Sequence, residues 1–287
     1  MNFGEFSYKL VHKIARKYSY FFKGIKEDLQ VSNMPHSLEE YFAMMIVSIL
    51  LSTPLIGIIA FFFYTLLDDL VLSIISGFIF YSIVLVGIIT LFYIYPSQVA
   101  SGRKKKIDNS LHFATIYMQT LAGTGAPPHI LFRILGSFEE FSEIASISRK
   151  ISRDIEMFGL DPVEAINRAA EKTPSTNLRE LLLGMRSTIT SGGDLKKYLE
   201  EKANAFVNEF RRKLEEFTKL LAVYMEIYIT MVIVGSVLAL VLTTIMSIIS
   251  GGIVGIETLQ ILIVTVGLPI MSVIFILLIK SSSPTEV

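Results

Sequence analysis

Four long apolar segments constrain this chain more than any other feature of its sequence. They run from about residue 43 to 67, 70 to 95, 220 to 249 and 258 to 279. An α-helix rises about 1.5 Å per residue, so each segment is long enough to cross roughly 30 Å of hydrocarbon. We therefore predict an all-α membrane protein with four transmembrane helices in two hairpins.

The composition agrees with this class and excludes several others. Apolar residues make up 52% of the 287 residues, charged residues make up 18%, and the chain contains no Cys. The lack of Cys excludes a disulfide scaffold, a thiolate metal site and a Cys nucleophile. The formal net charge is zero, from 26 basic and 26 acidic residues, so the overall charge does not indicate nucleic acid as a partner.

The distribution of the basic residues predicts the orientation of the spans. Residues 1–40 contain six of them, residues 101–219 contain nineteen, and Lys280 is the last. The two short connections within the hairpins contain none. Because Lys and Arg accumulate on the cytosolic side, we predict a multi-pass protein of the cell (cytoplasmic) membrane with both termini in the cytosol.

These assignments divide the chain into five parts. They are a cytosolic amphipathic N-terminal arm (1–40), a transmembrane hairpin (41–100), a cytosolic helical bundle (101–218), a second transmembrane hairpin (219–280) and a cytosolic tail (281–287). In the arm, apolar residues from Phe3 to Ile25 recur at three- and four-residue steps, as on one face of a helix. This basic helix would lie either on the inner leaflet or on the protein's own cytosolic domain.

Capping signals in residues 101–218 predict about six helices between the second and third spans. Their expected starts are, in chain order, Asp108, Pro127, Ser137 with Glu140, Asp161, Ser175 and Asp194. A further capping box, Ser37 with Glu40, is expected to open the helix of the first span. Pro54 is expected to kink that span, and Gly267 with Pro269 the fourth.

The sixth helix of the bundle has no obvious end before the membrane. From Leu195 the sequence contains no Pro before Pro269, so one helix of about 55 residues, roughly 80 Å long, could continue into the third span. A kink between Phe206 and Phe217 is equally compatible with the sequence.

The sequence contains none of the patterns that would indicate catalysis. It lacks a P-loop, a His-Glu-x-x-His zinc motif and a Gly-x-Ser-x-Gly elbow. We therefore expect no enzyme activity, no cofactor and no metal site. Glu226 lies within the third apolar segment, where an acid either has a function or extends to the interface.

Three stretches of the middle segment resemble a known domain. They read LHFATIYMQTLAGTGAPPHILFRIL from Leu111, DPVEAINRAAEKTPS from Asp161 and LLLGMRSTITSGGDLKKYLEEKA from Leu181. Their glycines, caps and apolar positions resemble the type II secretion system F domain of inner-membrane platform proteins in type II secretion and type IV pilus-like machines. The resemblance is greatest to the archaeal branch, which includes archaellum and archaeal pilus platforms, and two spans on each side of the domain agree with it.

The resemblance implies a non-enzymatic platform that couples a cytosolic hexameric secretion ATPase to the insertion of pilin-like subunits into a filament. Platform proteins often carry this domain twice, and it occurs once here. The resemblance therefore also implies a homodimer or a heterodimer with a paralogous platform chain. The alternative function is a small-solute permease subunit with a regulatory cytosolic domain.

Candidate contact residues follow from their positions. On the bundle, the basic residues expected to contact the ATPase, or else to be ordinary helix-surface charges, are Arg149, Lys150, Arg153, Arg168, Arg179 and Arg186. The residues expected to bind lipid headgroups and fix the topology are Arg103, Lys104, Lys105, Lys106, Arg211, Arg212 and Lys213. In the membrane, the residues expected to face a pilin or a second platform chain are Glu226, Gly235 and Ser236.

Overall fold

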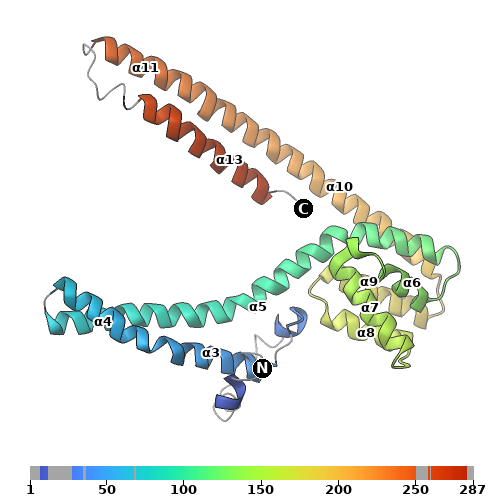
Figure 1. Ribbon diagram of the computed structural model, residues 1–287. Coiled ribbons are helices and arrows are strands. Elements are labelled where there is room, and N and C mark those ends of the chain that lie inside the picture. The colour runs from blue at the N-terminus through green and yellow to red at the C-terminus, as the bar shows by residue number, and fades with distance from the viewer. Residues whose placement is uncertain are drawn as a thin grey trace. The chain divides into compact units, whose positions relative to one another are not determined.

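The computed structural model describes residues 7–11, 28–34, 37–67, 69–249, 258 and 260–282. These residues are almost entirely helical and include no strand, and four of the helices are long and apolar enough to cross a membrane (Figure 1). The prediction of an all-α protein with four spans is therefore confirmed. Most of the amphipathic face expected between Phe3 and Ile25 lies outside the described residues. The chain divides into two compact units, residues 1–200 and 201–287.

The first span begins and breaks where the sequence predicts. Helix α3 (Leu38–Ser52) opens with the expected capping box: the Glu40 amide donates to the Ser37 hydroxyl at 3.2 Å, and the Ser37 amide donates to the Glu40 carboxylate at 3.0 Å. The helix is interrupted at Thr53, and α4 (Pro54–Leu67) starts at the proline. Proline suits this position because the first turn of a helix needs no N–H donor there.

Helix α5 (Leu70–Ala122) corrects one prediction. It contains the second span and continues without a break to Ala122, so the helix start expected at Asp108 is wrong. Pro96 lies inside the helix, and neither it nor Gly102 ends it. A helical Gly costs only about 1 kcal/mol relative to Ala, which the helix-forming residues around it offset. The Asp108 carboxylate instead accepts a hydrogen bond from the Ser175 hydroxyl at 2.5 Å.

The bundle consists of α6 (Pro128–Leu135), α7 (Ser142–Glu156), α8 (Pro162–Lys172) and α9 (Thr176–Thr190), packed with α5 and the start of α10 (Leu195–Tyr228). Three of the expected caps are confirmed. Asp161 accepts from the amide of Val163, Ser175 from that of Leu178, and Asp194 from those of Lys196 and Lys197, all at 2.9–3.2 Å.

The capping box expected at Ser137 and Glu140 is wrong. The Ser137 hydroxyl donates to the carbonyl of Ile134 at 2.6 Å and so closes α6, and α7 begins only at Ser142. Between them lies a 3-10 turn at Glu139–Phe141. Phe138 precedes this turn and Phe141 is its last residue, and their rings lie 5.0 and 5.6 Å from that of Tyr117 on α5. The packing of these aromatic side chains competes with the capping box and accounts for the later helix start.

One apolar core joins all the helices of the bundle. Its fully buried side chains are Ile107 and Leu111 of α5, Leu131, Phe132 and Leu135 of α6, Ile151 of α7, Ile166 of α8, Leu181, Leu182 and Met185 of α9, and Leu199 of α10. The second half of α5 and the first turns of α10 are therefore parts of the bundle rather than linkers.

The helix that starts at Leu195 continues to Ile249. It consists of α10, a π-helical stretch (Ile229–Val234) and α11 (Gly235–Ile249), which together form one helical segment of 55 residues. The kink allowed between Phe206 and Phe217 is absent, because that stretch is regular α-helix. The bundle and the third span thus share one helix of about 80 Å.

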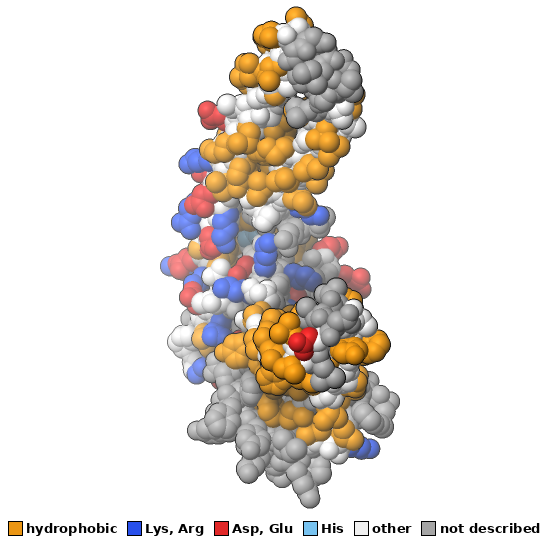
Figure 2. Space-filling view, turned by 90° about the vertical axis from the view of Figure 1, so that its left-hand side faces the viewer, with side chains coloured by type: hydrophobic (Ala, Val, Ile, Leu, Met, Phe, Trp, Pro, Cys, Tyr) orange, Lys and Arg blue, Asp and Glu red, His pale blue; other side chains and the backbone are white. Residues whose placement is uncertain are grey.

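The fourth span packs beside the third in the second unit. A second π-helical stretch (Ile263–Gly267) precedes α13 (Leu268–Ser282), so the helix is irregular where Gly267 and Pro269 were expected to disturb it. The Tyr228 ring lies 5.3 Å from that of Phe275, and the hydroxyls of Tyr224 and Ser282 are 3.1 Å apart. Apolar side chains cover the surfaces of both hairpins, whereas Lys, Arg, Asp and Glu gather over the bundle (Figure 2).

Candidate functional site

The six basic residues expected to contact an ATPase come from three consecutive helices of the bundle. Arg149, Lys150 and Arg153 lie on α7, Arg168 lies on α8, and Arg179 and Arg186 lie on α9. Their environments separate them into two groups. Two of them cap helix ends, and three line one pocket. Arg186 belongs to neither group and donates to the Asn167 side chain at 2.7 Å.

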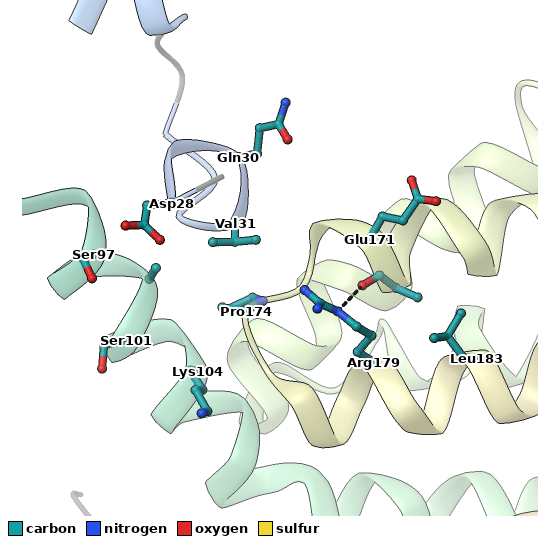
Figure 3. A pocket seen from close by; sticks show the side chains of 12 residues that line it. Asp28, Gln30, Val31, Ser97, Ser101, Lys104, Glu171, Pro174, Arg179 and Leu183 are labelled. Atoms are coloured by element: carbon teal, nitrogen blue, oxygen red, sulfur yellow. Dashed lines mark hydrogen bonds between the residues drawn. The ribbon is translucent and has the colours of Figure 1, made fainter. Parts of the chain in front are cut away.

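Arg149 and Arg179 bind the carboxyl ends of the preceding helices. The Arg149 guanidinium donates to the carbonyl of Gly136 at 2.7 Å, after α6. The Arg179 guanidinium donates to the carbonyl of Ala170 at 3.2 Å near the end of α8 (Figure 3). It also donates to the carbonyl of Thr173 at 3.1 Å, directly after that helix. The last carbonyls of a helix lack partners within it, so these contacts stabilise the bundle itself.

Arg179 also borders a cavity in the first unit. The cavity has a volume of about 650 Å³ and lies between residues 28–31, α5 and the α8–α9 pair (Figure 3). Charges of both signs line it, including Asp28, Lys104 and Glu171. It therefore brings Lys104, expected at the lipid headgroups, near Arg179, expected at the ATPase. Its mixed charge favours no single class of ligand.

Another cavity in the first unit, which we call the basic pocket, has a volume of about 230 Å³. Its lining includes Gln30, Asn33, Arg103, Lys150, Arg153, Asp154, Arg168 and Lys172. Five of these residues are basic and one is acidic. The structure thus brings Lys150, Arg153 and Arg168 together as the sequence analysis expected, and adds Arg103 and Lys172.

Arg103 anchors one wall of the basic pocket. Its Nε and Nη2 atoms donate to Glu143 Oε2 at 2.9 and 2.7 Å, and its Nη1 donates to the carbonyl of Val31. The side chains of this ion pair are only 11% and 23% exposed, so water screens it less than a surface pair. Arg103 therefore joins α5 to α7 and to residues 28–34, a structural contact that the sequence analysis did not predict.

Lys150 lies within reach of several other charges. Its Nζ donates to Asn33 Oδ1 at 2.6 Å. Burial lowers the pKa of Lys150, repulsion from Arg103, Arg153 and Lys172 lowers it further, and Glu143 partly offsets this. Arg153 and Arg168 are paired with Asp154 at 3.8 Å and Glu164 at 2.9 Å.

Lys172 is the pocket residue that the sequence analysis missed. The signal was available: positions 150 and 153 share a face of α7, and positions 168 and 172 share a face of α8. Two consecutive helices that each place a basic pair on one face can bring the pairs together when they pack. What the sequence did not show is which faces meet.

The remaining candidates near the membrane are more exposed. Lys104, Lys105 and Lys106 lie exposed on α5, and Arg211, Arg212 and Lys213 lie exposed on α10. Glu226 is exposed on α10, and the Ser236 hydroxyl donates to the Ile233 carbonyl at 2.9 Å. A Cβ added to Gly235 would meet only the Thr230 carbonyl, at 3.9 Å, which leaves space there. Within the described part of the chain, no group of three His, Asp or Glu residues is placed to hold a metal ion.

Comparison with known proteins finds similarity over most of the bundle and the third span. The family model of type II secretion system protein F matches residues 114–243, from the second half of α5 through the bundle into the third span. Flagella accessory protein J of Methanocaldococcus jannaschii is 28% identical over 158 residues, covering 54% of this chain and 28% of that protein. An uncharacterized protein of the same organism is 22% identical over 147 residues, covering 51% of this chain and 24% of its own length.

The matched part thus spans about a quarter of the length of each curated relative. No solved structure matches the chain. The four apolar helices and the matched domain indicate a multi-pass protein of the cytoplasmic membrane. Over residues 114–243 the chain is therefore similar to type II secretion system protein F, and over about half of its length it is similar to a flagella accessory protein.

Proposed function

We propose that this protein is the non-enzymatic membrane platform of a secretion, pilus or archaellum-like machine. In this role, a cytosolic hexameric ATPase binds the bundle and displaces it, and the spans guide pilin-like subunits from the bilayer into a filament. Both termini and the bundle then face the cytosol. The family match and the archaellum component among the relatives support this assignment.

The observation that carries the proposal is the unbroken helix from Leu195 to Ile249. Its first turns pack in the bundle through Leu199, and its apolar end forms the third span. A helix resists bending over this length because every turn is hydrogen-bonded to the next. Movement of the bundle would therefore be transmitted to the membrane without an intervening flexible linker.

The bundle surface offers a specific test of ATPase binding. Arg149 and Arg179 cap helices, so reversing their charge would also perturb the fold. Lys150 and Arg153 are better targets, and the variant Lys150→Glu/Arg153→Glu should weaken capture of the cognate ATPase at low salt. Exposed Lys196 and Lys197 on α10 provide a control with the same charge change, Lys196→Glu/Lys197→Glu. Equal capture by the two variants would contradict this choice of surface.

The membrane half can be tested by site-directed crosslinking. We propose that Glu226, Gly235 and Ser236 face a pilin or a second platform chain, identical or paralogous. The space at Gly235 supports this proposal, because small residues allow close helix approach in membranes. Photo-crosslinkers at these positions should give protein adducts, whereas one at Ile248, which is 76% exposed, should give mainly lipid adducts. Lipid adducts alone at all four positions would contradict the proposal.

A further inference from the structure

We propose that the basic pocket binds a phosphate group, either that of an anionic lipid headgroup or that of a soluble phosphate. The proposal is independent of the platform function, because it depends only on the residues that line the pocket. Four parts of the first unit form it: residues 28–34, α5, α7 and α8. A site that needs four separate parts of the fold is defined by tertiary packing rather than by one helix surface.

The charge of the pocket favours an anion. Its lining contains Arg103, Lys150, Arg153, Arg168 and Lys172 against a single acid, Asp154. Counting also Glu143 and Glu164, which pair with two of the arginines, leaves an excess of two positive charges. Among the described residues, neither Lys150 nor Lys172 has a carboxylate within ion-pair distance. These two ammonium groups are therefore the cations available to a ligand.

The cations that line the pocket repel one another, and a bound anion would offset this repulsion. Burial lowers the pKa of Lys150, and repulsion from Arg103, Arg153 and Lys172, partly offset by Glu143, lowers it further. A bound phosphate would place its negative charge among these cations and stabilise all of them. Charge-assisted hydrogen bonds from Lys and Arg to phosphate oxygens are stronger than neutral ones.

The size and chemistry of the pocket fit a single phosphate group. A volume of about 230 Å³ has room for several water molecules, each of which occupies about 30 Å³ in the liquid, so a phosphate with some bound water fits. The amides of Asn33 and Gln30 supply uncharged donors beside the cations. Apolar lining is limited to Ile147, Ile151, Ala165 and Ala169, which lie towards the core.

Both sources of phosphate are compatible with the position of the pocket. Arg103 lies eight residues after Tyr95, where the second apolar segment ends, which is about 12 Å along a helix. A lipid headgroup can therefore come close to the pocket. The cavity also belongs to the polar bundle, so a soluble phosphate could enter it from water.

The test uses the full chain and compares two sources of phosphate. In the first arm, the protein in an uncharged detergent is titrated with inorganic phosphate, with chloride at matched ionic strength as the reference. In the second arm, the protein is placed in nanodiscs of phosphatidylcholine with or without phosphatidylglycerol. The readout in both arms is hydrogen exchange of residues 28–34, 147–154 and 165–172, which border the pocket.

The decisive variant is Lys150→Gln/Lys172→Gln. It should lose at least tenfold in affinity for the phosphate source that protects the wild type. Lys196→Gln/Lys197→Gln removes the same charge from exposed positions outside the pocket and should bind as the wild type does. Lys150→Arg/Lys172→Arg keeps the charge and should retain binding, which separates loss of the site from loss of the fold.

Each outcome decides the proposal. Protection by phosphatidylglycerol alone identifies a lipid headgroup, and protection by inorganic phosphate identifies a soluble ligand; both support the site. Absence of protection in both arms overturns the proposal, as does equal loss of binding in the two Gln double variants. If the pocket variant loses ATPase binding while phosphate protects nothing in the wild type, the cations serve a protein partner and the proposal is wrong.

Discussion

Tyr198 at the start of α10 packs closely against Gly184 of α9, and substitution of the glycine tests this contact. A Cβ built at Gly184 would lie 1.9 Å from the Tyr198 hydroxyl oxygen and 2.4 Å from the ring carbon that carries it. The hydroxyl itself donates to the carbonyls of Leu181 at 3.1 Å and Glu180 at 3.3 Å. Gly184→Ala must therefore displace the Tyr198 ring from α9.

Three contributions set the size of the effect. Overpacking a tight contact costs about 1–3 kcal/mol. Loss of the Tyr198 hydrogen bond adds about 1 kcal/mol. The higher helix propensity of Ala offsets about 1 kcal/mol of this cost, because Gly184 lies in the interior of α9. The net destabilisation is about 2 kcal/mol, equivalent to a roughly 30-fold increase in local opening where exchange reports the opening equilibrium.

Hydrogen exchange of the full chain in detergent measures this opening in α9 and in the first turns of α10. Gly102→Ala is the matched control, because no atom lies within 4 Å of its added Cβ in the interior of α5, so the change should stabilise the helix slightly. In a Tyr198→Ala background, Gly184→Ala should no longer be destabilising. A Gly184→Ala protein with wild-type protection, or a penalty that persists without the tyrosine ring, would refute the reasoning.

Three further predictions concern the bundle and the topology. Ser175→Ala removes both the N-cap of α9 and the hydrogen bond to Asp108, so it should lower the free energy of unfolding by about 1–3 kcal/mol. Thermal melting followed by circular dichroism measures this loss. The control, Ser191→Ala at an exposed position, should change the free energy of unfolding by less than about 0.5 kcal/mol. The folded pKa of Lys150 lies below its ordinary value of 10.5, so the folded state holds this proton less tightly and the charge destabilises the fold below that pH. In phosphate-free buffer, the stability advantage of Lys150→Met over the wild type should therefore shrink as the pH rises towards 10.5, and a difference independent of pH would contradict this. Because the chain has no Cys, single cysteines introduced at Asp69 and Ser137 can be labelled in intact cells. If the bundle is cytosolic, only the cysteine at position 69 should react with an impermeant maleimide. Reaction of the cysteine at position 137 alone would show the opposite orientation.

The parts of the fold that could be predicted are those that local chemistry determines. The apolar segments set the spans, and the caps at Ser37, Asp161, Ser175 and Asp194 act through backbone amides two or three residues away. Two predicted helix starts were wrong, because contacts with residues distant in the sequence occupy those positions. Asp108 binds Ser175, 67 positions along the chain, and the aromatic contact of Tyr117 with Phe138 and Phe141 displaces the start of α7.

The contacts made by the basic residues of the candidate site were likewise predictable only in part. The sequence indicated that the bundle carries basic residues, but not which of them stabilise helix ends. Arg149 and Arg179 find carbonyl partners on other helices, and Arg103 pairs with Glu143, 40 residues away. Lys172 joins Lys150 only because α7 and α8 pack with their basic faces together. Such pairings depend on tertiary packing, which periodicity along one helix does not specify.

The most direct test of the account is the distance between spin labels along the long helix. Cysteines at exposed Asn204 and Lys219 flank the stretch from Phe206 to Phe217. Fifteen residues of uninterrupted α-helix separate their backbones by about 22 Å. Double electron–electron resonance on the full chain should therefore give one distance population near 22 Å, broadened by the label side chains. A second or clearly shorter population would show that the helix bends between the bundle and the third span, and would contradict the proposed transmission of movement.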